Sequence, residues 1–266
     1  MAMRTVSGWP MRFRRPFSAL LLVVLLSAAR GEAADLPRPD GAGGPAARED
    51  ASGTPGLGEV EAPPPVTIAD PLEPLNRAVF VFNDRFYYWL LRPAAKGYSF
   101  VVPEGARVSA GNFFSNVATP IRFAGNLLQG KFKGAGTEIL RFLVNSTIGM
   151  GGLFDPARDS FHLRKSDEDL GQTLGRYGLG HGLYLVLPIL GPSSLRDAAG
   201  STGDYFLDPV SYIKPWEASA GVKSGKTVNE TSLTLGQYED LTQSAVDPYV
   251  AVRDAYIQYR KKEVEE

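Results

Sequence analysis

Two segments of this 266-residue chain carry large apolar side chains at helical spacing. In residues 75–91 they gather on one arc of a helix, with polar side chains on the opposite arc. The apolar arc comprises Leu75, Ala78, Val79, Phe82, Phe86, Trp89 and Leu90, and the polar arc comprises Asn76, Arg77, Asn83 and Asp84. We expect this helix to end before Pro93, because a proline disfavours helix at the residue before it. The aromatic cluster at residues 87–89 fits a membrane interface and the exposed end of a core helix equally well.

The second segment, residues 131–145, has a much narrower polar side. Its polar line comprises Thr137, Glu138, Arg141 and Asn145. This pattern predicts a helix buried nearly all round, in protein or in lipid, with the polar line facing something wet. The helix spans about 22 Å, short of the roughly 30 Å hydrocarbon core, so it can enter one leaflet but not cross the bilayer. The alternative is the central helix of a soluble bundle, in which Arg141 pairs with Glu138.

The rest of the folded part indicates further, shorter helices. We expect them at residues 104–118, 120–128, 167–175, 192–199, 217–243 and 247–261. The apolar run 183–187 is a short strand or a buried segment, limited by Pro188. No strand-like alternation occurs elsewhere, so the pattern predicts a mainly α fold.

The N-terminal quarter of the chain differs in composition from the rest. Residues 1–33 combine early arginines, an apolar stretch from Phe17 to Ala29 and small residues at Gly31 and Ala33, which predicts a cleavable signal peptide. An uncleaved anchor is the alternative, although the stretch is shorter than the roughly 20 residues of a membrane span. Residues 34–69 are rich in Pro, Gly and Ala, which predicts a disordered linker. One folded domain is expected at residues 70–262.

Composition excludes several classes of function. Removing residues 1–33 leaves 23 basic and 28 acidic residues, a net charge of −5, which argues against a nucleic-acid partner. The chain has no cysteine and two histidines, so a zinc site is not expected. No Gly-x-Ser-x-Gly nucleophile motif is present. We therefore expect no catalysis, no metal and no cofactor.

One short motif could instead indicate a phosphate-binding loop. Residues 220–227 read AGVKSGKT, which fits a relaxed phosphate-binding P-loop. Such a loop needs a preceding buried strand and a following helix, so that backbone amides converge on the phosphates. The preceding Pro215, Trp216 and Glu217 form no such strand, so a solvated helix face or loop is the simpler interpretation. A nucleotide-dependent enzyme stays as a third hypothesis.

Several longer motifs occur in a fixed order. They are DPLEPLNR at 70–77, Phe82-Asn83, NSTIGMGGLFD at 145–155, EDLGQTLGRYG at 168–178, LPILGPSSLRD at 187–197 and DPY at 247–249. Together they resemble the MlaA family, also called VacJ, over about residues 70–260. The resemblance implies a single helical ring-like domain, monotopic in the inner leaflet of a Gram-negative outer membrane at its periplasmic face.

The same resemblance implies a function and partners. It implies a passive channel that removes misplaced phospholipids from the outer leaflet and passes them to a periplasmic lipid carrier of the MlaC type, which maintains lipid asymmetry. Trimeric porins are the implied neighbours. A structural or adhesion protein of the envelope, bound to porins without moving lipid, is the alternative from another class.

One departure from the family pattern affects how the protein would be anchored to the membrane. Family members typically carry a lipid-modified cysteine after the signal peptide, whereas this sequence has none. The apolar surface or the porins would then hold the protein in place.

We expect a lipid path at Asn83, Thr137, Arg141 and Asn145, and membrane-facing side chains at Phe82, Phe86, Trp89 and Phe142. Arg141 is the first choice for a phosphate headgroup, because a guanidinium matches phosphate oxygens.

Overall fold

The computed structural model describes residues 70–265, and the fold in this range is mainly helical, as predicted. The helices are α2 (Glu73–Phe86), α3 (Arg92–Val101), α4 (Glu104–Val117), α5 (Thr119–Leu128), α6 (Phe132–Thr147), α7 (Pro156–Asp159), α8 (Leu170–Arg176), α9 (Leu195–Leu207), α10 (Trp216–Leu233), α11 (Gln237–Ser244) and α12 (Pro248–Glu265). A π-helical turn, η1 (Tyr87–Leu91), a 3-10 turn, η2 (Pro209–Tyr212), and two strands, β1 (Tyr184–Leu187) and β2 (Gly191–Ser194), complete the list. The predicted signal peptide and linker lie outside the described residues.

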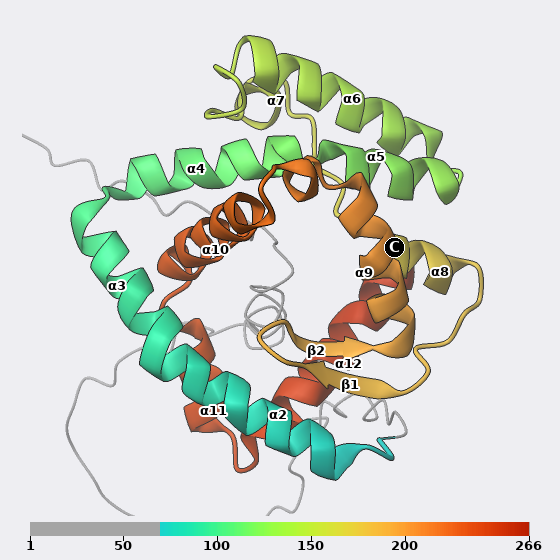
Figure 1. Ribbon diagram of the computed structural model, residues 1–266. Coiled ribbons are helices and arrows are strands. Elements are labelled where there is room, and N and C mark those ends of the chain that lie inside the picture. Colours follow the sequence, from blue (N-terminus) through green and yellow to red (C-terminus); the bar gives the residue numbers. More distant parts are fainter. Residues whose placement is uncertain (1–69, 266) are drawn as a thin grey trace, which may run out of the picture.

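Contacts between the elements close into a circuit (Figure 1). Starting from α2, the chain of contacts runs through η1, α3, α10, α4, α5, α8, α9, β2 and β1, and β1 returns to α2. Helix α6 packs on the outer side of α5, and α12 contacts α8, β2 and α11. Within residues 70–265 no helix is both long and apolar enough to cross a bilayer.

The first helix does not end before Pro93, which corrects the prediction. It passes through η1 and continues as α3, in which Pro93 occupies the first turn. In η1 the Arg92 N–H bonds the Tyr87 carbonyl, five residues back. A proline inside a regular helix clashes with the carbonyl four residues before it, and the wider π turn relieves this clash. The sequence gives no local signal for such a turn.

The two strands form a hairpin, of which the sequence predicts only the first strand. Residues 183–187 do contain a strand, β1, which pairs antiparallel with β2 in a register that matches Tyr184 with Ser194 and Leu187 with Gly191. Strand β2 overlaps the first three residues of the helix expected at 192–199 and was missed because its sequence Gly-Pro-Ser-Ser has no strand signature. Helix α9 begins at Leu195, where the Ser194 side chain caps it by accepting from the Asp197 N–H.

The long helix expected at 217–243 is in fact two helices. Helix α10 ends at Leu233 and α11 begins at Gln237. Gly236 between them has a φ of 95°, a left-handed conformation that glycine adopts without strain.

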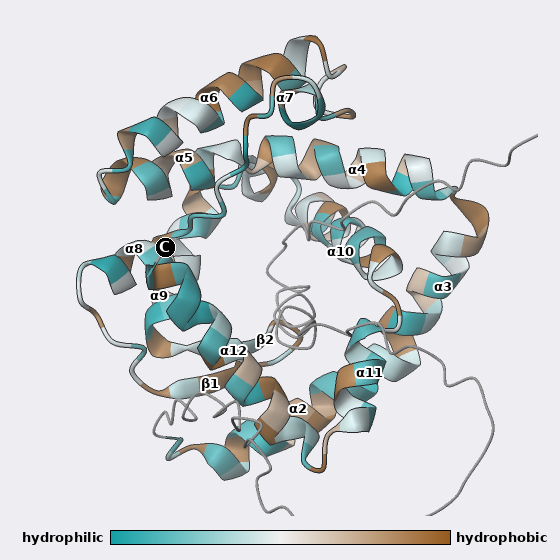
Figure 2. Ribbon diagram, turned by 180° about the vertical axis from the view of Figure 1, so that it is seen from behind, coloured by the Kyte–Doolittle hydropathy of each residue, from teal (hydrophilic) through white to brown (hydrophobic). Residues whose placement is uncertain are grey.

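The interior of the described part is unusual in composition. Buried polar and charged side chains outnumber buried apolar ones, and many large apolar side chains are exposed. Two small apolar clusters exist. One joins the hairpin to α12 through Tyr184, Val186, Tyr249, Tyr256 and Ile257, and the other pairs Tyr87 with Tyr238. In Figure 2, apolar and polar residues alternate along α6, α4 and α2 rather than separating by helix.

Candidate functional site

The polar line predicted on α6 exists, but it lies on the buried side of the helix. Glu138 is fully buried and pairs with Arg122 of α5 at 2.6 Å. Its second oxygen accepts the Ser166 N–H at 2.7 Å. Glu138 is therefore the partner of Arg122 and not of Arg141, which corrects the pairing considered for a soluble bundle.

Arg141 lies in the same buried layer, opposite Asp155. Its guanidinium donates to both Asp155 oxygens at 3.0 and 2.9 Å and also to the Leu163 carbonyl. Asn145 donates to Asp155 at 2.9 Å and accepts the Ala157 N–H at 3.0 Å. Burial alone would raise the pKa of Asp155, but the charge of Arg141 and these hydrogen bonds hold it below its usual range.

This arrangement changes the meaning of the polar line. The expected wet face of α6 is a polar interior shared with α5 and with the segment around α7. Among residues 70–265, the Thr137 hydroxyl donates only to the Lys133 carbonyl of its own helix. Lipid contact by Asn83, Thr137, Arg141 and Asn145 stays a prediction, and for Arg141 the geometry provides a protein partner instead.

The apolar side of α6 is the exposed one. Phe132 is 71% exposed, Leu140 53% and Leu143 52%. Phe142 on α6 is also exposed, as are Phe82 and Trp89 on α2 and η1, whereas Phe86 is half-buried. A contiguous apolar surface over buried charges is costly in water and favourable in an apolar surrounding. The lipid contact expected of these four aromatic residues stays a prediction.

A cavity of about 620 Å³ lies inside the circuit of elements. Helices α4, α5, α9, α10 and α12 enclose it together with the hairpin. Its apolar wall includes Phe114, Val117, Ile121, Leu187 and Leu190. Its polar wall includes Ser201, Thr202, Asp208, Lys223 and Lys226. We call this space the central cavity; its two kinds of wall suit a molecule with a charged and an apolar part.

The two lysines of the central cavity come from the P-loop-like motif. Residues 220–227 lie within α10, so they form no phosphate-binding loop. Lys223 donates to Ser211 at 2.8 Å, lies 3.4 Å from Asp208 and sits 4.5 Å from the centre of the Tyr205 ring. Lys226 has no hydrogen-bond or ion-pair partner among residues 70–265. The spacing of three residues puts both ammonium groups on one helix face, in agreement with the helix interpretation of this motif and not with the loop.

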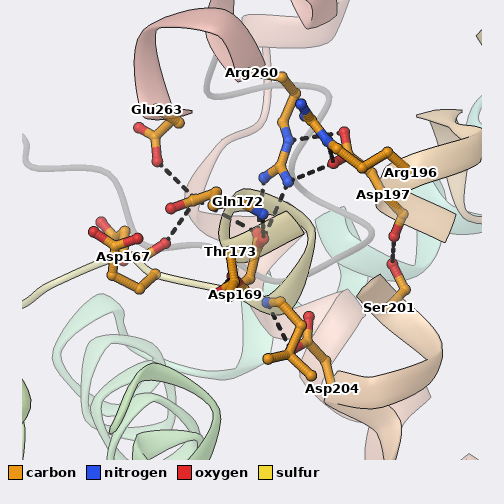
Figure 3. A network of polar contacts seen from close by, with 12 residues as sticks. Asp167, Asp169, Gln172, Thr173, Arg196, Asp197, Ser201, Asp204, Arg260 and Glu263 are labelled. Carbon is orange, nitrogen blue, oxygen red and sulfur yellow. Dashed lines mark hydrogen bonds and ion pairs between the residues drawn. The ribbon is translucent and has the colours of Figure 1, made fainter. Parts of the chain in front are cut away.

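A buried ionic network forms one wall of the central cavity (Figure 3). Arg260 of α12 bridges Asp169, which caps α8, and Asp197 of α9, at 2.7 and 2.8 Å. Arg196 pairs with the same Asp197 at 2.9 Å. Burial alone would raise the pKa of Asp197, but the two guanidinium groups hold it well below its usual range. The network ties α12 to the α8–α9 pair.

Helices α8 and α9 approach so closely that the contact requires glycine. A Cβ on Gly200 would lie 2.2 Å from the Gly171 nitrogen. This approach places Asp204 beside the first turn of α8, where one carboxylate oxygen accepts the Leu170 N–H at 3.2 Å. The other oxygen is buried with no hydrogen-bond partner among residues 70–265. Burial and the charge of Asp169 raise the pKa of Asp204 to about 7.

Two asparagines of α2 hold the hairpin. Asn76 donates to the Tyr184 carbonyl at 3.0 Å and accepts the Val186 N–H at 2.9 Å. Asn83, two helical turns later, donates to the Leu187 carbonyl at 2.9 Å and accepts the Ile189 N–H at 2.7 Å. Each amide thus pairs with the outer edge of β1 as a neighbouring strand would. The polar arc of α2 faces inward and fixes the hairpin at the cavity wall.

No group of three or more His, Cys, Asp or Glu side chains in the described range has the arrangement of a metal site. The polar lining of the central cavity combines the ammonium groups of Lys223 and Lys226 with carboxylates such as Asp208, and much of the remaining lining is apolar.

Comparisons with known proteins give consistent matches. Residues 68–263 match the family described as MlaA lipoprotein. The intermembrane phospholipid transport system lipoprotein MlaA of Escherichia coli strain K12 is 34% identical over 193 residues, 71% of this chain and 76% of that protein. The protein of the same name from Haemophilus influenzae is 35% identical over 200 residues, with 71% and 76% covered. An uncharacterized Rickettsia conorii protein is 36% identical over 201 residues, with 75% and 80% covered.

A solved structure agrees with these sequence matches. It comes from work described as "Structural basis for maintenance of bacterial outer membrane lipid asymmetry". It superposes with a TM-score of 0.66 at 34% identity and covers 74% of this chain and 100% of its own.

Proposed function

Because this chain belongs to the MlaA lipoprotein family, we propose that it is a passive phospholipid channel of the outer membrane. In this proposal it removes misplaced phospholipids from the outer leaflet and keeps the membrane asymmetric. The observation that carries the proposal is the central cavity, which is lined both by two lysines and by an apolar wall inside a circuit of helices and strands. The relatives named for intermembrane phospholipid transport point to the same class of cargo.

The mechanism we propose needs no reacting group. A phospholipid moves down its own gradient, and the protein lowers the cost of taking its charged headgroup out of water. Lys223 and Lys226 offer positive charge to the phosphate, and Phe114, Val117 and Ile121 offer apolar surface to the acyl region. No step consumes a nucleotide, so residues 220–227 act in this proposal only as part of the cavity wall.

The surface supports the placement that we propose. The exposed apolar faces of α6 and of α2 with η1 would lie in the inner leaflet at the periplasmic side, where lipid replaces the water that such faces disfavour. They would hold the protein in place without a cysteine-linked lipid, alone or together with a trimeric porin. A periplasmic carrier of the MlaC type would receive the phospholipid.

The test is complementation of a strain that lacks the gene. The readout is the amount of phospholipid in the outer leaflet. We expect Lys226→Glu to accumulate normally yet fail to restore asymmetry, because it places a negative charge where the phosphate passes. Lys96→Glu is the matched control: Lys96 is exposed on α3 and lines no part of the cavity, so this variant should restore asymmetry.

Two outcomes would count against the proposal. A fully active Lys226→Glu would remove the lysines from the lipid path. A deletion strain with normal asymmetry would favour the alternative, a structural envelope protein bound to porins without lipid transport.

A further inference from the structure

A second, smaller cavity lies on the other side of the hairpin turn. It measures about 70 Å³ and we call it the side pocket. Its wall is mainly apolar and comes from α2, η1, the hairpin, the ends of α10 and α11, and α12. The lining includes Phe80, Phe86, Tyr87, Leu91, Val186, Ile189, Leu190, Thr231, Tyr238 and Val252.

The side pocket separates the two apolar clusters of the molecule. Phe80 and Val186 on its wall belong to the cluster that joins the hairpin to α12. Tyr87, Leu91 and Tyr238 belong to the other cluster. Protein interiors are close-packed, so an apolar space between two clusters leaves both of them incomplete. An apolar group that entered this space would join them into one core.

The polar groups at the wall of the side pocket favour an apolar occupant over water. The Tyr87 hydroxyl donates to Glu239 at 2.8 Å, and the Tyr238 hydroxyl donates to Asp84 at 2.8 Å. Both hydrogen-bonding groups of the Asn83 amide are taken by the hairpin. An ordered water needs about two to four polar partners. These three side chains already have theirs, and the Tyr184 hydroxyl, which is buried at this wall without a hydrogen-bond partner among residues 70–265, offers one.

The side pocket and the central cavity share a wall. Leu190, Gly191 and Pro192 line both spaces, and Leu190 is 51% exposed. The hydrogen bonds of Asn83 hold this turn in place from the side of α2. The π turn η1 forms the opposite wall, and π turns inside α-helices are frequent at functional sites.

From these observations we infer that the side pocket takes the end of one acyl chain of a phospholipid whose headgroup lies in the central cavity. The inference rests on the function proposed above and adds a place for the tail. The lysines of α10 hold the phosphate on one side of the hairpin turn. The chain passes Leu190 and ends between the two clusters, where it completes the apolar packing.

Photocrosslinking of the full chain in phospholipid nanodiscs tests this inference. The probe is a phosphatidylglycerol with a diazirine at the end of one acyl chain, and labelled residues are mapped by peptide mass spectrometry. We expect labels inside the side pocket, at Leu91, Val186 or Tyr238, in addition to the outer faces of α6 and α2. Labels confined to outward-facing residues such as Phe132 and Leu140 would overturn the inference.

A variant whose side pocket is partly filled by a larger side chain gives a sharper test than the unmodified protein alone. Thr231→Leu adds bulk to the pocket wall, and Thr147→Leu adds the same bulk at the exposed end of α6, away from both cavities. We expect Thr231→Leu to lower the interior labels by about tenfold, since overpacking a closed site costs at least as much as a tenfold change in affinity. Thr147→Leu should leave them unchanged. If Thr231→Leu does not fold, the labelling of the unmodified protein still decides.

Two further probes separate this inference from the proposed function. A phosphatidylglycerol with the diazirine on its headgroup should label α10 near Lys223 and Lys226. If it does so while the chain-end probe misses the side pocket, only the present inference fails. If neither probe labels the interior, the proposed function fails as well. A diazirine fatty acid that labels the side pocket where the phospholipid probe does not would assign the pocket to free fatty acids and overturn the inference.

Discussion

The α5–α6 pair and the unit formed by the hairpin and α12 are built in opposite ways. The α5–α6 pair buries Arg122, Glu138 and Arg141 and exposes Phe132 and Leu140. The hairpin–α12 unit buries Tyr184, Val252 and Ile257, and the exposed face of α12 carries Gln258 and Lys261. The same hydrophobic effect explains both arrangements if their surroundings differ. The comparison therefore teaches that the first unit suits an apolar medium and the second an aqueous one.

The largest effect is expected from breaking the buried charge pair of the first unit. Arg141→Ala leaves Asp155 buried without its counter-charge and should lower the free energy of unfolding by about 3–5 kcal/mol. Arg158→Ala is the control. Its side chain is 36% exposed, pairs with Asp159 at 2.6 Å and reaches Asp155 only at 4.0 Å, so the change should stay below about 1 kcal/mol. Denaturation in detergent micelles measures both; equal losses would mean that burial does not distinguish the two arginines.

The ionic network that ties α12 to the α8–α9 pair should respond to substitution in the opposite direction. Asp169, Asp197 and Asp204 face Arg260 and Arg196, so ionised Asp204 adds one negative charge too many. The pKa of Asp204 is raised to about 7 by burial and by Asp169. A carboxyl group with a raised pKa in the folded state binds protons that the unfolded state has released. Stability therefore falls as pH rises from about 4 to about 7, and it stays lower above that range.

Asp204→Asn removes this penalty and keeps an acceptor for the Leu170 N–H. We expect it to raise the free energy of unfolding by about 3 kcal/mol at pH 8, about two-thirds of the full conversion of the pKa shift, because the network relaxes. The gain should shrink towards zero near pH 4. Unfolding titrations of both proteins across this range measure the difference, and a gain independent of pH would contradict this account.

One substitution made in both units gives the most direct comparison. Ile257→Val removes a methylene from a fully buried side chain and should cost about 1 kcal/mol. Ile139→Val makes the same change on the exposed side of α6, where Ile139 is 43% exposed, and should cost less than about 0.5 kcal/mol in micelles. Thermal or chemical unfolding of the pair is the measurement. Equal costs would place Ile139 in a packed protein core.

The smallest effect on stability is expected on the apolar face itself. Leu140→Ser should change the free energy of unfolding in micelles by less than about 0.5 kcal/mol. It should nevertheless weaken retention on liposomes in a flotation assay, because it removes apolar surface that we propose to lie in lipid. Gln258→Ser on α12 should leave flotation unchanged. If both variants float like the unmodified protein, the apolar face does not contribute to membrane binding.

Much of the helical architecture could be predicted from the sequence, because helix periodicity is a local property. The two arcs of α2 and the polar line of α6 are real. The side of a helix that faces inward cannot be predicted from local sequence, because it depends on the medium around the folded protein. An amphipathic pattern looks the same whether its polar side meets water or, as with Arg141, a partner fourteen residues away.

The parts of the site that were missed have the same cause. The hairpin partners of Asn83 lie more than 100 residues away and could not be predicted, whereas its expected contact with lipid stays a prediction. The sequence of residues 220–227 fits a helix face or a loop, and only the fold shows that Lys223 and Lys226 line a cavity. The strand Gly191–Ser194 exists because β1 offers an edge, not because its own residues favour one.

The bridge made by Arg260 also sets an order of events during synthesis. Asp169 and Asp197 are both buried, and their shared counter-charge lies 63 or more residues further along the chain. Until that arginine arrives, closing α8 onto α9 would bury carboxylates that lack their strongest partner. The central cavity can therefore acquire its finished wall only after residues 70–260 are all available. A ribosome-bound chain that stops short of Arg260 should leave the α8–α9 pair open to proteases.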